Sequence, residues 1–391
     1  MEDIVIIGGG IGGMTAAIAL RQRGLAATVY EAAAELRPVG AGILVPPNAM
    51  QVYGRLGVAD AVQQAGFVPR AAEILDARDG LLQRSDSVGL AGSYGFPTVA
   101  IHRARLHGVL AAALGPAAIR LGKACTAIVD EPGGALVRFA DGDAVRARVV
   151  IGADGLRSVV RQHLFPDAAL RYSGQSSYRA VVPFALPEEI ADVGWEVWGA
   201  GCRFGFSSVA PGEVYWYATV DAAPGTERDR RPYKERLAEL FADFPAPIAA
   251  LIAATPETSM LNTDIYDLRP LARWHRGRVV LLGDAAHATT PNLGQGGAQA
   301  VEDAAVLAEY LATHREPEAA FASYERRRRA KASMVVARSW SIGKLAHVRN
   351  PVARAARNVV MRSIPPAMVA RQFDTIFRLD DAPAQAGQPV G

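Results

Sequence analysis

The stretch Ile4-Val-Ile-Ile-Gly-Gly-Gly-Ile-Gly-Gly13 decides the fold of this chain. Its first four residues are an apolar run, which is typical of a strand buried on both faces of a parallel sheet. The glycines that follow predict a turn into a helix over 14–23, which Gly24 closes. Ala26–Tyr30 then predicts a second strand. This strand–loop–helix–strand unit has the size of half a dinucleotide-binding domain.

The glycine spacing in this loop suits a nucleotide pyrophosphate. Gly8 permits a tight turn, Gly10 lets the backbone approach the phosphates, and Gly13 allows the helix to pack closely on the strand. The N–H groups at the start of the helix attract an anion. Glu31 follows the second strand, where a carboxylate can accept hydrogen bonds from the hydroxyls of an adenosine ribose. These features predict a dinucleotide and leave open whether it is NAD or FAD.

A second glycine-rich segment favours FAD. Val279–Leu282 predicts a buried strand, and Asp284 lies at its carboxyl end, where it can accept a hydrogen bond from a polyol hydroxyl. The segment from Pro291 to Gly297 carries few bulky side chains, so its backbone can lie flat against a planar ring. Its N–H groups can then face the negative charge of a reduced flavin. The alternative is an ordinary strand–loop–helix crossover that uses glycines as helix caps.

Composition excludes several other classes of protein. The 391 residues include 42 basic and 39 acidic side chains, and a net charge of +3 argues against a dedicated polyanion binder. Cys125 and Cys202 are too few for a disulfide framework or a thiolate metal site, and we expect no metal. Strand residues begin at Ile4, which leaves no room for a signal peptide. With no apolar run of ~20 residues, a cytoplasmic protein is expected.

The chain is predicted to be an α/β protein, in which a Rossmann-like FAD-binding domain with a parallel sheet is interleaved with a smaller α+β substrate domain. Residues 117–151 alternate and suit an antiparallel insertion, and aromatic-rich strands between 172 and 265 predict an antiparallel sheet in the second domain. C-terminal helices follow. The predicted boundaries are 1–75, 98–170 and 266–330 for the FAD-binding domain, 76–97 and 171–265 for the substrate domain, 331–380 for the C-terminal helical region, and 381–391 for a disordered tail.

Three residues of the second domain are candidates for positioning the substrate. Tyr215 and Tyr217 share one strand face by the period of two, and Arg203 lies on the predicted neighbouring strand. A guanidinium could hold an anionic or enolised ring, whereas the aromatic strands favour a planar hydrophobic ring. The alternative is a surface arginine beside two tyrosines that pack in the core. Arg179 is a candidate of the same kind.

The roles of several later residues stay open in the sequence. His287 can act as an acid or base, or pack and cap beside the glycine-rich segment. We interpret Arg326–Arg329 as a solvated helix face rather than a patch for nucleic acid or membrane, because consecutive helical residues fan around the axis. Residues 335–378 mix apolar residues with arginine at roughly helical spacing. They either cover the substrate domain or touch a membrane surface if the substrate is lipophilic.

Three motifs in this order resemble the class A flavoprotein aromatic hydroxylases, the para-hydroxybenzoate hydroxylase superfamily. They are Gly8 to Gly13, Ala153-Asp-Gly-x-Arg-Ser-x-x-Arg161, and Gly283 to Gly297. The resemblance runs from residue 4 to about residue 330. It is nearest to the branch of salicylate hydroxylase, urate hydroxylase and zeaxanthin epoxidase. In this family the middle motif links the binding of flavin and of pyridine nucleotide.

The resemblance implies a role for individual residues. Glu31 would hold the adenosine ribose, Asp284 a ribityl hydroxyl, and Arg103 the flavin–pyrophosphate region. Arg157 would support the cofactor, and Arg161 would either do the same or form a surface ion pair. Arg203 and Tyr215 would position the substrate, in a pocket with Tyr217, Arg179 and Pro291. The residues implied to bind FAD are Gly8, Gly10, Gly12, Gly13, Glu31, Ala32, Arg103, Cys125, Asp154, Asp284, Gly294, Gln295, Gly296 and Gly297.

The implied chemistry needs no metal. FAD would be bound tightly and non-covalently, with NAD(P)H and O2 as co-substrates. Through a flavin C4a-hydroperoxide, the protein would hydroxylate or epoxidise an aromatic or conjugated small molecule. No nucleic acid or integral membrane association is implied, and the protein would be a monomer or homodimer. A flavin-dependent reductase or oxidase, and a flavin-binding protein without turnover, are the alternatives.

Overall fold

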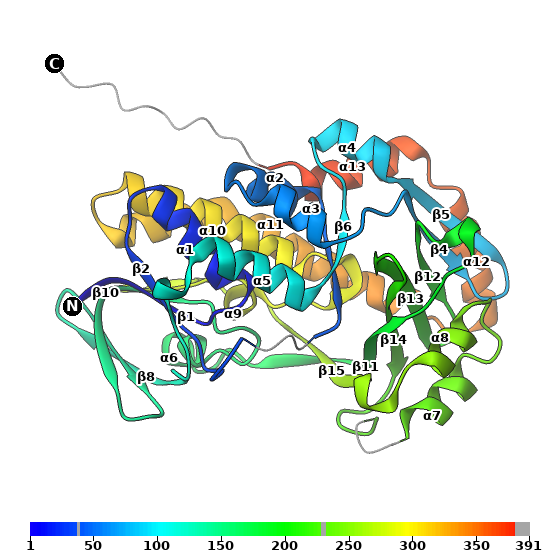
Figure 1. The fold of residues 1–391 in the computed structure, drawn as a ribbon, viewed down its shortest axis with the longest axis horizontal. Coiled ribbons are helices and arrows are strands. Elements are labelled where there is room, and N and C mark those ends of the chain that lie inside the picture. The colour runs from blue at the N-terminus through cyan, green and yellow to red at the C-terminus, as the bar shows by residue number, and fades with distance from the viewer. Residues whose placement is uncertain (37–39, 228–231, 380–391) are drawn as a thin grey trace.

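Two sheets lie side by side and are bridged by long helices in the computed structural model, which describes residues 1–36, 40–227 and 232–379 (Figure 1). The nucleotide sheet has the strand order β16-β17-β10-β1-β2-β7. Its strands are β1 (Glu2–Ile7), β2 (Ala27–Tyr30), β7 (Ile119–Arg120), β10 (Ala144–Gly152), β16 (His275–Arg276) and β17 (Val279–Leu281). Strand β1 runs parallel to β2 and β10, and β10 runs parallel to β17. The predicted Rossmann-like parallel sheet is confirmed.

A hairpin extends this sheet. Strands β8 (Cys125–Glu131) and β9 (Gly134–Phe139) pair antiparallel, and β9 continues the ladder onto β10. Its two turns fall at 132–133 and 140–143, where Pro132-Gly133 and Asp141-Gly142 supply the turn residues. The antiparallel insertion predicted for residues 117–151 is therefore present.

Helices cover the nucleotide sheet. Helix α1 (Ile11–Gln22) begins earlier than the predicted residue 14, because the Gly10 carbonyl already accepts a hydrogen bond from the Met14 N–H. Buried alanines at 16, 17 and 19 keep this helix thin, which allows close packing against α10. The other helices around this sheet are α2 (Pro47–Arg55), α3 (Ala59–Ala65), α5 (Arg103–Leu114), α6 (Val159–Leu164), α9 (Asp284–His287) and α10 (Gly296–Thr313).

The substrate sheet has the order β15-β11-β14-β13-β12-β4-β5 and is antiparallel except where β12 meets β4. Its strands are β4 (Ala71–Asp76), β5 (Gly80–Asp86), β11 (Leu170–Pro183), β12 (Val193–Trp198), β13 (Cys202–Ala210), β14 (Glu213–Asp221) and β15 (Leu261–Leu268). Tyr178, Phe204 and Trp216 pack one face onto α7 (Tyr233–Leu240) and α8 (Ile248–Ala254). Strands β4 and β15 extend a few residues beyond the predicted boundaries at 76 and 265.

Residues 42–45 lie between glycines and prolines, yet they form β3 (Gly42–Val45), which pairs with β6 (Val99–His102). The expected boundary after residue 330 falls inside α11 (Pro317–Ala346), a helix of 30 residues. The predicted disorder of 381–391 concerns residues outside the described part of the chain.

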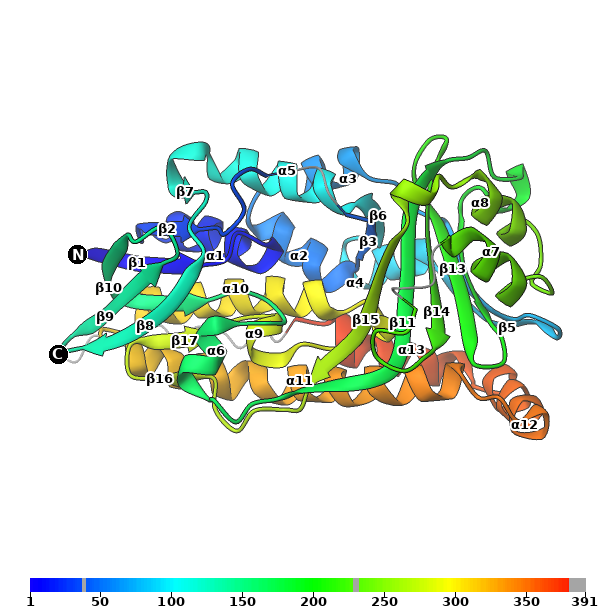
Figure 2. The same cartoon turned by 90° about the horizontal axis from the view of Figure 1, so that it is seen from below.

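The C-terminal helices join the two sheets. Helix α11 runs along the molecule from the nucleotide sheet to the substrate sheet, and α12 (Pro351–Arg362) projects at the far end (Figure 2). Helix α13 (Pro366–Phe377) returns to α2, and α4 (Ser87–Tyr94) contacts it through a hydrogen bond from Tyr94 to Asp374. Among the described residues, no helix is both long enough and apolar enough to cross a membrane.

Candidate active site

The first glycine loop has one open side. Gly8 has a φ of +103°, and a Cβ there would overlap the carbonyl of Ala153. A Cβ on Gly13 would overlap the Gly8 carbonyl oxygen. By contrast, a Cβ on Gly10 would have no protein atom within 4 Å. The loop is therefore closed at Gly8 and Gly13 and open at Gly10, where a pyrophosphate can approach the start of α1.

The side chains of Glu31 and His107 form hydrogen bonds with the backbone of this loop at Gly9. The Glu31 carboxylate accepts hydrogen bonds from the N–H of Gly9 at 2.6 Å and of Ala33 at 2.9 Å. The Nε2 atom of His107 lies 2.6 Å from the Gly9 carbonyl oxygen. The sequence analysis did not find His107, since a lone histidine inside a helix carries no motif. Glu31 thus lies beside the glycine loop, and its contact with a ribose stays a prediction.

The second motif packs against the glycine loop through Ala153. Asp154 accepts hydrogen bonds from Ser158 Oγ at 2.5 Å and from the N–H groups of Val159 and Val160, so its side chain caps α6. Arg161 is 2% exposed and donates to the carbonyl oxygens of Leu156 and Ala285. The surface ion pair considered for Arg161 is therefore wrong, because the guanidinium joins the second motif to the third. Arg157 is exposed.

Arg103 lies close enough to Asp284 to act on its charge. Asp284 is exposed, yet desolvation by the surrounding protein raises the pKa of its carboxyl. The positive charges of His287 and Arg103 act in the opposite direction. Nearby, burial and then the negative charge of Asp154 raise the pKa of the Cys125 thiol to about 11. That thiol is protonated at neutral pH.

The third motif offers a cofactor mainly its main-chain atoms. Pro291–Leu293 forms one 3-10 turn, Gly294 has a φ of +62°, and α10 begins at Gly296. The Gln295 side chain is 1% exposed and turns inward, where its Oε1 accepts a hydrogen bond from Asn48 at 3.0 Å. Gln295 can therefore reach a cofactor only through its main chain.

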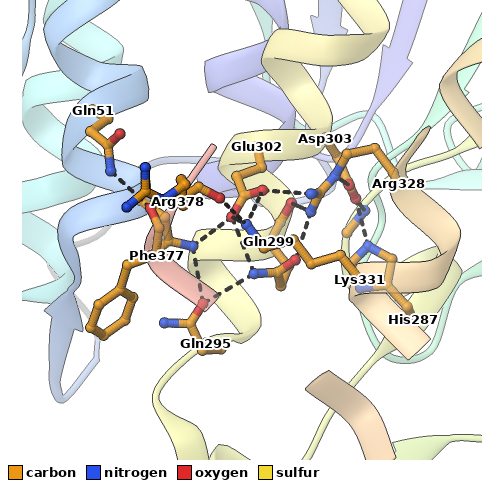
Figure 3. A network of polar contacts seen from close by, with 12 residues as sticks. Gln51, His287, Gln295, Gln299, Glu302, Asp303, Arg328, Lys331, Phe377 and Arg378 are labelled. Carbon is orange, nitrogen blue, oxygen red and sulfur yellow. Dashed lines mark hydrogen bonds and ion pairs between the residues drawn. The ribbon is translucent and has the colours of Figure 1, made fainter. Parts of the chain in front are cut away.

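A buried network of charges lies behind this motif (Figure 3). Asp303 accepts hydrogen bonds from the Gly283 N–H at 3.1 Å and from Arg328 at 2.7 Å, and lies 2.5 Å from His287 Nε2. Arg328 and Lys331 also pair with Glu302, at 2.5 and 3.0 Å. His287 is buried, in agreement with a packing role. The predicted solvated face is wrong at Arg328, which is 2% exposed and fixes the segment that follows β17.

The inward face of the substrate sheet carries the second group of candidates. In the β13–β14 hairpin, Arg203 lies opposite Thr219, and Tyr217 lies opposite Gly205. Arg203 is 1% exposed, so the alternative of a surface arginine is wrong. Its guanidinium donates to Thr219 Oγ1 and to Glu196 Oε1, both at 3.0 Å, and to Asn292 Oδ1. Every nitrogen of the guanidinium thus has a partner, and Glu196 balances its charge.

The two tyrosines line the same face. Their ring centroids are 5.9 Å apart, and the hydroxyl of Tyr217 donates to Glu196. Each ring packs over a glycine, Tyr215 over Gly42 and Tyr217 over Gly205, where a Cβ would overlap the ring. Desolvation by the surrounding protein raises the pKa of Tyr215 to about 12, although the residue is only partly buried.

Arg179 lies at the margin of this group. It stands opposite Tyr217 on β11 and is half-buried, and its Nη2 donates to Thr263 Oγ1 at 2.8 Å.

Asn292 joins the two halves of the site and was missed by sequence analysis. Its Oδ1 accepts from Arg203, and its Nδ2 donates to Thr290 Oγ1 at 2.9 Å and to the Ser339 carbonyl oxygen at 2.7 Å. A single amide therefore links the substrate sheet, the third motif and α11. An asparagine between two glycine-rich stretches gives no sequence signal for such a contact.

Comparison with known proteins identifies the family. Residues 1–339 match the model of an FAD binding domain. The chain is 41% identical over 360 residues to Aurachin C monooxygenase/isomerase of Stigmatella aurantiaca, covering 92% of this chain and 93% of the relative. It is 36% identical over 379 residues to 2-heptyl-3-hydroxy-4(1H)-quinolone synthase of Pseudomonas aeruginosa, covering 96% and 97%.

A solved structure agrees with this assignment. Klebsiella pneumoniae HpxO in complex with FAD and uric acid superposes with a TM-score of 0.88 at 30% identity, covering 96% of each chain. The three motifs, the two-sheet architecture and these matches lead to one conclusion. The chain belongs to the FAD-binding class A flavoprotein monooxygenases and is an FAD-dependent enzyme that hydroxylates aromatic substrates.

Proposed function

We propose that the substrate of this monooxygenase is an uncharged, planar nitrogen heterocycle of the 4-quinolone class, bound between the third motif and the tyrosines of the substrate sheet. The observation that carries this proposal is the state of Arg203. The sequence left two substrate types open, an anionic ring held by Arg203 and a planar hydrophobic ring held by aromatic strands. The contacts of Arg203 favour the second.

Each nitrogen of the Arg203 guanidinium already has a hydrogen-bond partner within the protein. Its three nitrogens bind Thr219, Glu196 and Asn292, and the pair with Glu196 has no net charge. An anionic substrate would have to break this pair and leave Glu196 with only its neutral donors, Tyr217 and Trp198. Removing one partner of a fully buried ion pair costs about 3–5 kcal/mol. The cost is smaller here because Glu196 is 21% exposed, but a neutral ring that leaves the pair intact still binds more easily.

The tyrosines supply the complementary surface. Tyr215 and Tyr217 offer adjacent aromatic rings for stacking, each worth about 0.5–1.5 kcal/mol beyond the buried area. Because the pKa of Tyr215 is about 12, its hydroxyl keeps its proton at neutral pH and can donate a hydrogen bond to a ring carbonyl. A 4-quinolone has both a planar ring and such a carbonyl. The relative from Pseudomonas aeruginosa is named for a 4-quinolone product, which supports the same class.

The residues of the nucleotide sheet fit FAD. The open side at Gly10 would admit a pyrophosphate, and Glu31, which binds the neighbouring Gly9 N–H, would hold the adenosine ribose. The exposed Asp284 would bind a ribityl hydroxyl. The main chain from Gly294 to Gly297 is available to the ring. We assign Gly8, Gly12, Gly13, Ala32, Arg103, Cys125 and Asp154 to the walls of this site. Bound FAD supplies the activation of O2 and the transfer of one oxygen atom to the substrate.

The protein groups orient the ring and exclude water. Asn292 and Arg203 fix the distance between the substrate sheet and the third motif, so that the reacting carbon and the flavin are held together. The rings of Tyr215 and Tyr217 keep water from that space.

A comparison of substrates tests the proposal. The purified FAD-loaded enzyme is mixed with a 2-alkyl-4-quinolone, with uric acid, or with salicylate. NAD(P)H oxidation is then measured, and the H2O2 released is subtracted. We expect coupled oxidation to be at least about tenfold faster with the quinolone, which is the effect of about 1.4 kcal/mol. Faster coupled turnover of either anion would reject the proposed class and leave the hydroxylase assignment intact.

A further inference from the structure

Helix α12 buries polar residues and exposes apolar ones. Its polar residues Arg357 and Asn358 are buried, whereas Val352, Val359 and Val360 are 76%, 62% and 63% exposed. Exposed alanines at 353, 355 and 356 extend the same outward surface. On a helix that only covered a globular domain, the apolar residues would face inward.

The inward face is held by charge. Arg354 and Arg357 both donate to the Asp76 carboxylate, at 3.0 and 2.6 Å, and Asn358 donates to Asp79 at 2.6 Å. Of the apolar residues, Met361 alone is buried, in a small cluster that includes Trp198. Because these contacts fix the rotation of α12, its valines are directed away from the substrate sheet.

The segment around α12 is basic. From Lys344 to Phe373 the sequence contains six lysines and arginines and no aspartate or glutamate. Arg349 precedes the helix with 65% of its side chain exposed, and Arg362 ends the helix on the exposed surface. Both arginines also bind the protein, Arg349 through Asp221 and Arg362 through the carbonyls of Asp79 and Leu81. An exposed apolar strip with basic ends results, at the end of the molecule in Figure 2.

We propose that α12 binds the surface of an anionic phospholipid bilayer, with its valines among the acyl chains and its arginines at the headgroups. An amphipathic helix with basic residues beside its apolar face binds in this way. A second copy of the chain fits less well. Three valines give much less than the ~800 Å² per partner of a stable dimer, and a two-fold contact through α12 would bring the basic ends of both helices together.

Vesicle flotation with the full-length, FAD-loaded protein tests this surface. Vesicles of phosphatidylglycerol and phosphatidylcholine are compared with pure phosphatidylcholine, at low and high salt. We expect binding to the anionic vesicles, weaker binding to the neutral ones, and release by salt, since charge attraction is screened. The triple variant Val352→Ser/Val359→Ser/Val360→Ser should lower the partition coefficient at least about tenfold.

Val129→Ser is the matched control. Val129 is 42% exposed on β8, at the opposite end of the molecule, and this variant should bind vesicles as the wild type does. Flavin absorbance and circular dichroism establish that both variants fold. The proposal is overturned if the anionic vesicles do not bind the wild type, if salt has no effect, or if the triple variant binds equally well. A concentration-dependent dimer that the triple variant abolishes, without vesicle binding, would identify a second copy as the occupant instead.

Discussion

The substitution Gly10→Ala separates binding of the cofactor from stability of the fold. Gly10 precedes α1 with φ −73° and ψ −175°, a conformation that alanine adopts without strain, and its Cβ would meet no protein atom within 4 Å. Loss of glycine as the N-cap and the lower entropy of the unfolded chain offset each other to within about 1 kcal/mol. Unfolding of the apoprotein by urea should therefore change little.

The affinity of the Gly10→Ala variant for FAD should change much more. The new methyl group occupies the open side of the loop, where the pyrophosphate lies against the backbone. Overpacking of one methyl group costs about 1–3 kcal/mol, which raises the Kd by about 5- to 150-fold. The Kd is measured by titrating the apoprotein with FAD and following flavin fluorescence.

Gly92→Ala is the matched control for this substitution. Gly92 lies in α4, and a Cβ there also meets no atom within 4 Å. This variant should bind FAD as the wild type does. Wild-type FAD affinity in Gly10→Ala would refute the assignment of the open side to the pyrophosphate.

Four further predictions concern single residues in and around the site. Asn292→Ala should uncouple the enzyme, because Arg203 and the Ser339 carbonyl each lose a partner; H2O2 per NAD(P)H oxidised should rise severalfold, and an unchanged ratio would argue against a positioning role. Arg328→Met should lower the free energy of unfolding by about 3–5 kcal/mol, since two buried carboxylates, Glu302 and Asp303, each lose one of their partners; urea unfolding measures this loss, and a loss below about 1 kcal/mol would contradict it. Burial alone would raise the pKa of Asp303, but His287 and Arg328 hold it well below its ordinary value. The ionised Asp303 carboxylate therefore contributes its full stabilisation above about pH 4, and this contribution is lost as the pH falls further. Urea unfolding between pH 5 and 3 should show a larger loss of the free energy of unfolding in the wild type than in Asp303→Asn. Cys125, with a pKa of about 11, should react with iodoacetamide much more slowly at pH 7 than a small-molecule thiol, and rapid alkylation in a peptide map would contradict it.

Sequence reasoning recovered the elements whose signal is local. The run Ile4–Ile7 is buried as expected, and the glycines at 8, 10 and 13 differ in their surroundings as their assigned roles require. Turn residues placed the β8–β9–β10 insertion. These features depend on periodicity and on backbone conformation, which single residues and short spacings determine.

Features that depend on tertiary contacts were not predictable. Arg161 and Arg328 look like surface residues within helices, yet both are buried because their partners come from distant segments. Strand β3 lies in a stretch with several glycines and prolines, and it forms because β6 pairs with it across more than 50 residues. Asn292 and His107 act through long-range hydrogen bonds that no sequence spacing indicates.

Incorporation of isotopic oxygen tests whether this chain is a monooxygenase. The FAD-loaded enzyme is incubated with NAD(P)H, a 2-alkyl-4-quinolone and ¹⁸O2, and the product is examined by mass spectrometry. We expect one ¹⁸O atom in each hydroxylated product and no product without O2. Product formed under strict anaerobiosis, or carrying oxygen from water, would show that the chain does not transfer oxygen from O2.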